Sequence, residues 1–313
     1  MMNYMSHTSK MTGRRLPVVR ALLMMRNLLA LSALFSLCTV NYVSAASNVV
    51  KSSVKSSVKT TVELPLQGVT LEYKADVRLL QVLDDVNASF NANASSNENA
   101  SDSIGYFPLS DQLFDKTNTQ AIETKKRNVL NQLEAFAVEE PEANLVRQQL
   151  ASFQYLNRVF IELDRNAVIS QSDKNPLLVS SSDTNKPSPA AIKRASTSQA
   201  QAFSLYLPQR PTSIQLMGAI KESVTMNLIE HGTLNDYLDA LPNDFIGESA
   251  DKSVAYVVQP DGVVQTIQYA YWNEQPVYLA PGAIVFMAFY SLPSEYSTLN
   301  QDIVDLLRHK VGL

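Results

Sequence analysis

The chain has 313 residues, of which 45% are hydrophobic and 18% are charged, and its formal net charge is −4. This composition is typical of a globular protein and not of a disordered or membrane-spanning chain. The weak negative charge, with no basic patch carrying interleaved aromatic residues, argues against a nucleic-acid partner. A chain of this length is expected to form one or two domains.

The N-terminus predicts an exported protein. Several arginines precede an uncharged stretch from Leu28 to Val40, and small residues follow at Ser44–Ala46. This order is that of a secretory signal peptide, which we place at residues 1–46, and it predicts a periplasmic protein. A membrane anchor is the alternative, but the apolar run is shorter than the roughly 20 residues that a spanning helix needs.

The single cysteine, Cys38, lies inside this apolar run. A lipoprotein signal has a small residue directly before its cysteine, whereas Leu37 occupies that position here, so we expect no lipidation. Once the signal peptide is removed, the chain holds no cysteine. Disulfides and thiolate chemistry are therefore excluded from the expected mature protein.

A first domain is predicted over residues 61–179, after a low-complexity tether at 47–60 with the repeat VKSS-VKSS-VKTT. Residues 61–71 read as strand, turn and strand, and 76–86 as a helix. Two apolar stripes at helical spacing then predict a helical hairpin within about 118–157. Residues 158–163 return to a strand pattern.

A second domain is predicted over residues 203–290, after a Ser-rich flexible connector at 180–202. Its elements, in order, are a strand near Ile214, a short helix capped by Thr233, a hairpin on Pro260-Asp261-Gly262 and a buried strand after Pro281-Gly282. Residues 291–313 predict a C-terminal amphipathic helix with Asn300 as its N-cap. Its apolar side is formed by Ile303, Val304, Leu307 and Val311.

Four segments carry a resemblance to a known family, and they occur in the order LYLPQRPTSIQLMGAI, VVQPDGVVQTIQYAYWN, LAPGAIVFMAF and LNQDIVDLLRHKVGL. This ordered set resembles the soluble-ligand-binding β-grasp repeat of outer-membrane polysaccharide exporters and, more narrowly, the capsule-biosynthesis GfcC family. The resemblance implies an α+β fold with two β-grasp (ubiquitin-like) domains. It also implies a helical hairpin insertion in the first domain and the C-terminal amphipathic helix.

The resemblance further implies a periplasmic, non-catalytic accessory protein for the assembly and export of capsule or exopolysaccharide. Its expected partner is the polysaccharide or an outer-membrane polysaccharide exporter. The terminal helix is similar to the helix with which such exporters span the outer membrane. It is therefore expected to pack on an exporter, on a second copy of the chain, on a membrane surface or on its own protein.

Catalytic motifs are missing from the sequence. After the signal peptide only His231 and His309 remain as histidines, and neither lies in a recognised catalytic or metal-binding motif. We therefore expect no enzyme activity, no metal and no cofactor. A glycan-modifying or glycan-hydrolysing enzyme stays as an alternative because a glycosidase needs only two carboxylates, and a subunit of the export channel is another.

Three sets of residues are candidates for binding. Arg158 begins a strand among apolar residues, and the resemblance implies an arginine at this place in a cleft between the two domains. The alternative is a strand-edge arginine that points to water. Tyr271, Trp272 and Asn273 combine aromatic rings with an amide, which suits sugar recognition, although aromatic residues on strands more often belong to a core. Arg210 is the third candidate, for which an ion pair at the domain junction is the simpler explanation.

Overall fold

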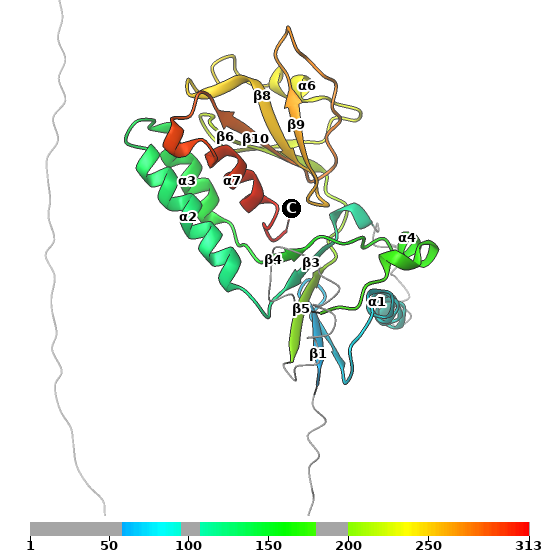
Figure 1. Ribbon diagram of the computed structural model, residues 1–313. Helices are drawn as coiled ribbons and strands as arrows, with labels where there is room; N and C mark the ends of the chain where they lie inside the picture. The colour runs from blue at the N-terminus through cyan, green and yellow to red at the C-terminus, as the bar shows by residue number, and fades with distance from the viewer. Residues whose placement is uncertain (1–57, 95–106, 180–199, 313) are drawn as a thin grey trace, which may run out of the picture. The chain divides into compact units, whose positions relative to one another are not determined.

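Figure 1 shows the computed structural model of the chain, which describes residues 58–94, 107–179 and 200–312. These residues form two five-stranded sheets and six α-helices. Each sheet has a parallel pair of strands at its centre, flanked by antiparallel neighbours. The predicted α+β class is confirmed, and both sheets are β-grasp-like.

The first sheet has the order β2-β1-β5-β3-β4. A tight turn joins β1 to β2, and β1 runs parallel to β5, which comes from much later in the chain. Helices α1 and α4 contribute Val82, Leu83, Val86 and Val168 to the core of this sheet. The bounds are β1 Thr60–Leu64, β2 Val69–Tyr73, β3 Gln112–Asp115, β4 Asn157–Val159, β5 Gln201–Tyr206, α1 Leu79–Ala94 and α4 Arg165–Ser170.

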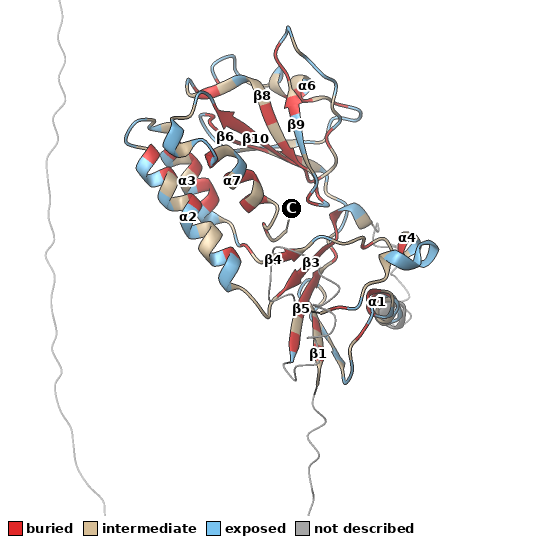
Figure 2. Cartoon of the chain, viewed as in Figure 1, coloured by how far each residue is buried: buried red, intermediate tan, exposed pale blue. Residues whose placement is uncertain are grey.

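The second sheet has the order β7-β6-β10-β8-β9, with β10 parallel to β6 and antiparallel to β8. All six residues of β10 are buried, because apolar clusters cover both faces of the sheet (Figure 2). The short helix has the predicted cap, where Thr233 and Asp236 bond each other. The bounds are β6 Ser213–Gly218, β7 Val224–Asn227, β8 Ala250–Val258, β9 Val264–Gln268, β10 Ile284–Phe289 and α6 Leu234–Leu238.

Two helices, α2 (Gln120–Phe136) and α3 (Glu142–Ser152), follow each other between β3 and β4. The two predicted helices are thus present, although along the chain they interrupt the first sheet. Their apolar sides share a cluster with the second sheet, in which Leu133 and Val146 lie with Phe286. That this pair is an insertion into the first domain stays a prediction.

The first strand that we assigned to the second domain belongs to the first sheet. We placed residues 203–206 in the second domain, but β5 pairs with β1 and β3 of the first sheet. The second sheet begins at β6. The error has a physical cause: the parallel partner of β5, β1, lies about 140 residues earlier, and the pattern of a strand carries no information about its neighbours.

The C-terminal helix α7 (Leu299–Leu307) corrects a second prediction. Its N-cap residue is Thr298, whereas the Asn300 side chain bonds both the N–H and the C=O of Phe289, at 3.0 and 2.9 Å. Ile303, Val304 and Leu307 are at most 2% exposed, because they pack in the cluster shared with α2, α3 and the second sheet. The apolar side predicted for a partner or a membrane therefore covers the protein's own core.

Several predictions fall on residues outside the described ranges. They are the signal peptide at 1–46, nearly all of the tether at 47–60 and most of the connector at 180–202. Thr60, the last residue assigned to the tether, is the first residue of β1. Within the described residues, no helix has the length and apolar character needed to cross a membrane.

Candidate functional site

Arg158, in β4, is a buried arginine that contacts three separate segments. Its side chain donates to the carbonyl oxygen of Pro260 at 2.6 Å, to that of Asp111 at 3.4 Å and to that of Arg308 at 3.5 Å. The residue is 7% exposed. A strand-edge arginine pointing to water is therefore not what the structure shows. The guanidinium instead connects β4 to the β8–β9 turn and to the end of α7.

The charge of Arg158 is compensated mainly by main-chain dipoles. Burial lowers its pKa to about 10, an effect that Asp261 opposes and Arg308 reinforces. The group stays protonated at neutral pH. A buried cation with its N–H groups bonded to carbonyl oxygens avoids the large cost of an unpaired charge, and the planar guanidinium fits several acceptors at once.

The β8–β9 turn, which we call the PDG turn (Gln259–Val263), lies against this arginine. Gly262 has a φ of +85°, and its N–H bonds Gln259 O at 2.8 Å. Arg308 donates from Nε to Gly262 O at 2.8 Å, and its guanidinium lies 4.2 Å from the centre of the Phe160 ring. The sequence predicted this hairpin. It did not predict that carbonyl oxygens of the turn accept hydrogen bonds from two arginine side chains.

The chain after α7 completes the junction. His309 accepts the Arg158 N–H at its Nδ1, at 3.0 Å, and its own carbonyl accepts from Leu156 N. Burial lowers the pKa of His309 to about 4, with nearby Lys125 adding to the effect, so the ring is neutral at pH 7 and able to accept at Nδ1. Val311, predicted for the partner helix, donates its N–H to Gln154 O at 2.9 Å.

Asp111, whose carbonyl oxygen accepts from Arg158, has a buried carboxylate. The residue is 3% exposed, and its Oδ2 is shielded from solvent and has no hydrogen-bond partner within the described part of the chain. Burial, together with a smaller effect of the negative charge of Asp164, raises its pKa to about 8. The sequence offered no signal for this aspartate, because its burial depends on segments that are distant along the chain.

Arg210 lies between β5 and β6, in the segment that joins the two sheets. The residue is exposed, and its guanidinium lies 5.3 Å from the centre of the Phe107 ring. Among the described residues, no carboxylate lies within ion-pair distance of it. The contact that the structure shows for this cation is with an aromatic face.

The predicted aromatic cluster lies in a turn that follows β9, which we call the aromatic turn (Ala270–Asn273). Asn273 N–H bonds Ala270 O at 3.0 Å, so Tyr271 and Trp272 occupy the two central positions. Tyr271 is 97% exposed and Trp272 is 75% exposed. The alternative that these rings belong to a core is therefore excluded for both.

Asn273, the third residue of the predicted cluster, is less exposed than the two rings. The Asn273 side-chain oxygen is shielded from solvent and has no hydrogen-bond partner among the described residues, while the main-chain N–H closes the turn. Tyr269 lies on the other side of the turn and is 7% exposed, with its hydroxyl bonded to Asp251 O at 2.6 Å. The turn thus has a buried base and an aromatic tip.

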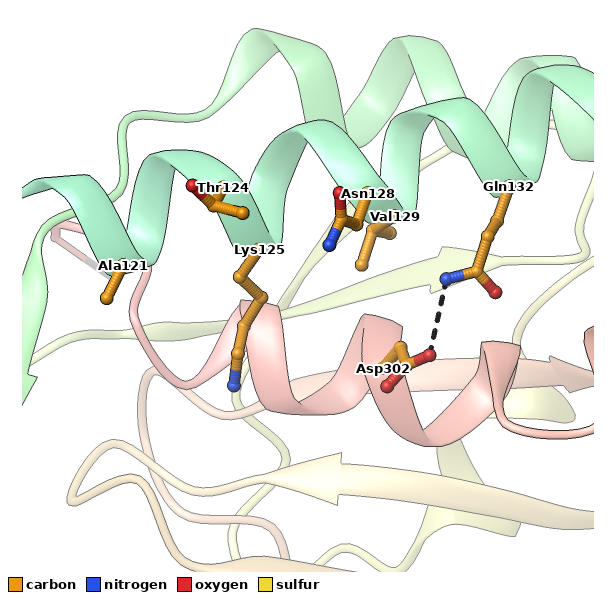
Figure 3. Close-up of a pocket in the computed structure, with 7 residues that line it drawn as sticks. All are labelled: Ala121, Thr124, Lys125, Asn128, Val129, Gln132 and Asp302. Carbon is orange, nitrogen blue, oxygen red and sulfur yellow. Dashed lines mark hydrogen bonds between the residues drawn. The ribbon is translucent and has the colours of Figure 1, made fainter. Parts of the chain in front are cut away.

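A hollow of about 320 Å³ lies between α2 and α7 (Figure 3). Gln132 of α2 donates to Asp302 of α7 at 3.4 Å, and Asp302 also accepts from Thr298 at 2.9 Å. The hollow is large enough for a small polar group or a few waters. Its lining residues are Ala121, Thr124, Lys125, Asn128, Val129, Gln132 and Asp302.

A second hollow, of about 610 Å³, lies where α1 begins. Its carboxylates are already paired: Asp76 with Lys59 at 2.6 Å, Asp84 with Arg165 at 2.7 Å, and Asp85 with the Tyr73 hydroxyl at 2.9 Å. Across the part of the chain that the structure describes, no group of three or more His, Cys, Asp and Glu residues is placed to hold a metal ion.

Comparison with known proteins finds a family model that the C-terminal region matches and one distant relative. Residues 222–312, which contain β7 to β10, α6 and α7, match the family model described as capsule biosynthesis GfcC C-terminal. The uncharacterized protein YjbG of Escherichia coli (strain K12) is 26% identical over 170 residues. This match covers 54% of the present chain, which spans about 60% of the length of that relative.

The fold gives the structural class of the protein, and the two matches indicate the family that it resembles. The two sheets and their flanking helices make it a β-grasp-like protein of the α+β class. The two matches support a GfcC-like capsule-biosynthesis family, and they confirm the resemblance predicted from the sequence. Both the PDG turn and the aromatic turn lie in the matched region.

Proposed function

We propose that this chain is a non-catalytic accessory protein for the assembly and export of a capsule or exopolysaccharide, and that it acts in the periplasm. The observation that carries the proposal is the match of residues 222–312 to a family described by capsule biosynthesis. A periplasmic location is supported by the signal-peptide pattern at residues 1–46.

The geometry supports a binding role better than a catalytic one. Arg158 and His309, two groups with shifted pKa values, lie at one buried junction, where Arg158 donates to main-chain carbonyls and His309 accepts from a main-chain N–H. Asp111 is the residue that most resembles a general acid, with a pKa near 8, but its unpaired oxygen is shielded from solvent. A general acid must reach the atom that it protonates.

The first test removes the encoding region and measures both the surface polysaccharide and its intracellular precursors. We expect cells that still make the polymer but display far less of it, and we expect the full chain, supplied again, to restore display. Unchanged display after the deletion would overturn the proposed role. Loss of the precursors themselves would instead move the protein from export to synthesis.

Two further measurements separate the accessory role from its alternatives. The purified protein is incubated with surface polysaccharide from the same cells, and the polymer's chain length and substituents are compared before and after. A glycan-modifying enzyme changes one of them, whereas an accessory protein changes neither. Cell fractionation then distinguishes a periplasmic accessory from a subunit of the export channel, which would remain with the outer membrane in a detergent-resistant complex.

A further inference from the structure

We propose that Tyr271 and Trp272 form a stacking surface for the sugar rings of the surface polysaccharide. This inference rests on the proposed function, which supplies the class of ligand, and it adds the place on the protein where that ligand binds. The observation that supports this inference is that two consecutive aromatic side chains, 97% and 75% exposed, occupy the tip of a single turn.

The turn holds its rings at the surface by fixing its own base. Besides the Asn273–Ala270 bond across the tip, Gln275 N–H donates to Gln268 O at 2.9 Å and joins the returning chain to the end of β9. Tyr269 and Ala270 are 7% and 6% exposed, so the base is anchored in the second sheet. A preorganised turn lowers the conformational entropy that a ligand would otherwise have to remove on binding.

The chemistry of the tip suits a carbohydrate. A sugar ring presents a face of C–H groups that packs on an aromatic face, while its hydroxyls remain free to bond water or polar side chains. Tyr and Trp offer large, rigid contact areas at a low cost in side-chain entropy. A repeating polymer can bind through such a small surface because many sugar units along one chain are available to it.

Two other occupants fit the tip less well. Residues 269–276 contain one charged side chain, Glu274, and its negative charge does not favour an anionic membrane surface. A protein partner would need a continuous patch with an apolar centre of several hundred square ångströms. The three residues that follow the two rings, Asn273, Glu274 and Gln275, are polar instead, and Tyr269 and Ala270 before them are buried.

The chain offers a direct optical probe of this surface, because Trp272 is its only tryptophan. The full-length purified protein is titrated with surface polysaccharide purified from the cells that make it, and tryptophan emission is followed. We expect a shift of the emission to shorter wavelength and a reduced quenching by acrylamide, since stacking removes the indole from water. A polymer-induced change in emission reports on the turn itself.

Variants test the two rings separately. Tyr271→Ala keeps the reporter, and its affinity for the polysaccharide is expected to fall about tenfold or more, as for other anchoring aromatic residues. Trp272→Ala is measured by calorimetry and is expected to lose at least as much, while Trp272→Phe retains part of the affinity. Tyr290→Ala is the matched control: this tyrosine is 68% exposed and lies outside the turn, and its removal is expected to leave binding unchanged.

The outcomes separate this inference from the proposed function. If the polysaccharide leaves the emission of Trp272 unchanged, or if Tyr271→Ala binds as the wild type does, the stacking surface is wrong even where deletion of the encoding region abolishes display. If lipid vesicles with anionic headgroups shift the emission and the polysaccharide does not, a membrane is the ligand and the inference is overturned. If deletion leaves display intact, the proposed function itself has failed.

Discussion

The two turns at the ends of β9 have opposite surroundings. The PDG turn precedes the strand, and its Pro260 and Gly262 are buried and accept hydrogen bonds from Arg158 and Arg308. The aromatic turn follows the strand and leaves Tyr271 and Trp272 in solvent. Both turns are closed by a local main-chain hydrogen bond, at 2.8 and 3.0 Å respectively.

Local chain geometry therefore does not decide what a turn does in this protein. The PDG turn is fixed from outside by cations that come from the other sheet and from the end of α7. The aromatic turn is fixed only from its base, so its tip is free to meet a ligand. We infer a structural role for the first turn and a binding role for the second, and the following changes are designed to test that difference.

The largest effect is expected for Arg158→Ala. The substitution removes a buried guanidinium and leaves the carbonyl oxygens of Pro260, Asp111 and Arg308 without their shared donor. We expect the free energy of unfolding to fall by about 3 to 4 kcal/mol, since each charge-assisted bond contributes about 1.5 to 3 kcal/mol. Equilibrium unfolding in urea measures the change.

Arg210→Ala is the matched control for this substitution. Arg210 is an exposed arginine whose guanidinium contacts one aromatic ring, so its removal is expected to change stability by less than about 0.5 kcal/mol. Arg158→Lys should lie between the two, because one ammonium group cannot reach the same set of acceptors with a fixed geometry. A stability loss for Arg210→Ala equal to that for Arg158→Ala would contradict the structural role given to the junction.

The next effect on stability depends on pH and comes from the buried carboxyl group of Asp111. Burial raises the pKa of Asp111 to about 8, so folding favours its protonated form. The stability it contributes is complete below about pH 4, the usual pKa of an unfolded aspartate, and is lost as the pH rises toward 8. We expect Asp111→Asn to remove this loss.

The measurement compares wild type and Asp111→Asn at several pH values between 4 and 8. The stability of the variant relative to the wild type is expected to rise by on the order of 3 kcal/mol across this range. His309, whose lowered pKa destabilises the fold as the pH falls from about 6.5 to 4, is present in both proteins and cancels from the difference. A difference independent of pH would show that Asp111 does not titrate in this window.

Sequence patterns predicted most of the elements of the second sheet, because each of these carries its own local signal. The capping pair Thr233 and Asp236 and the Pro-Asp-Gly hairpin both depend on residues a few positions apart. What the patterns did not show is which surfaces these elements bury. The apolar side of α7 was clear from its spacing, yet part of its cover comes from α2 and α3, more than 140 residues earlier.

The candidate site shows the same limit at the level of single residues. The sequence singled out Arg158 and the pair Tyr271 and Trp272, but burial separates them into a structural residue and an exposed surface. No local sequence pattern identified Asp111, or the carbonyl oxygens of the PDG turn that accept hydrogen bonds from arginines. Their roles arise only when segments from both sheets meet, which a pattern within one segment does not record.

A smaller effect is expected for Gly262→Ala in the PDG turn. Its φ of +85° disfavours any side chain, and an added Cβ would lie 2.5 Å from Cε1 of Phe160. We expect a loss of about 2 kcal/mol in the free energy of unfolding. Gly68→Ala is the control, because Gly68 also has a positive φ, +66°, but has no atom within 4 Å of an added Cβ.

The two glycine variants separate backbone strain from contact with the neighbouring domain. If the junction contact matters, Gly262→Ala destabilises by more than Gly68→Ala, and the excess is reduced when Phe160→Ala is combined with it. Phe160 is 42% exposed, so its own truncation leaves most of the fold unaffected. Equal losses for the two glycine variants would mean that the PDG turn is no more constrained than an ordinary hairpin turn.

The smallest effect on stability is expected at the aromatic turn. Tyr271→Ala and Trp272→Ala remove rings that are largely in water already, so the free energy of unfolding should change by less than about 0.5 kcal/mol. Urea unfolding followed by circular dichroism gives this value without the tryptophan signal. Tyr269→Phe is the internal contrast: it removes a buried hydroxyl bonded to Asp251 O and should cost about 1 kcal/mol. A substantial loss from Trp272→Ala would assign the ring to the packing of the sheet, and the difference between the two turns would no longer hold.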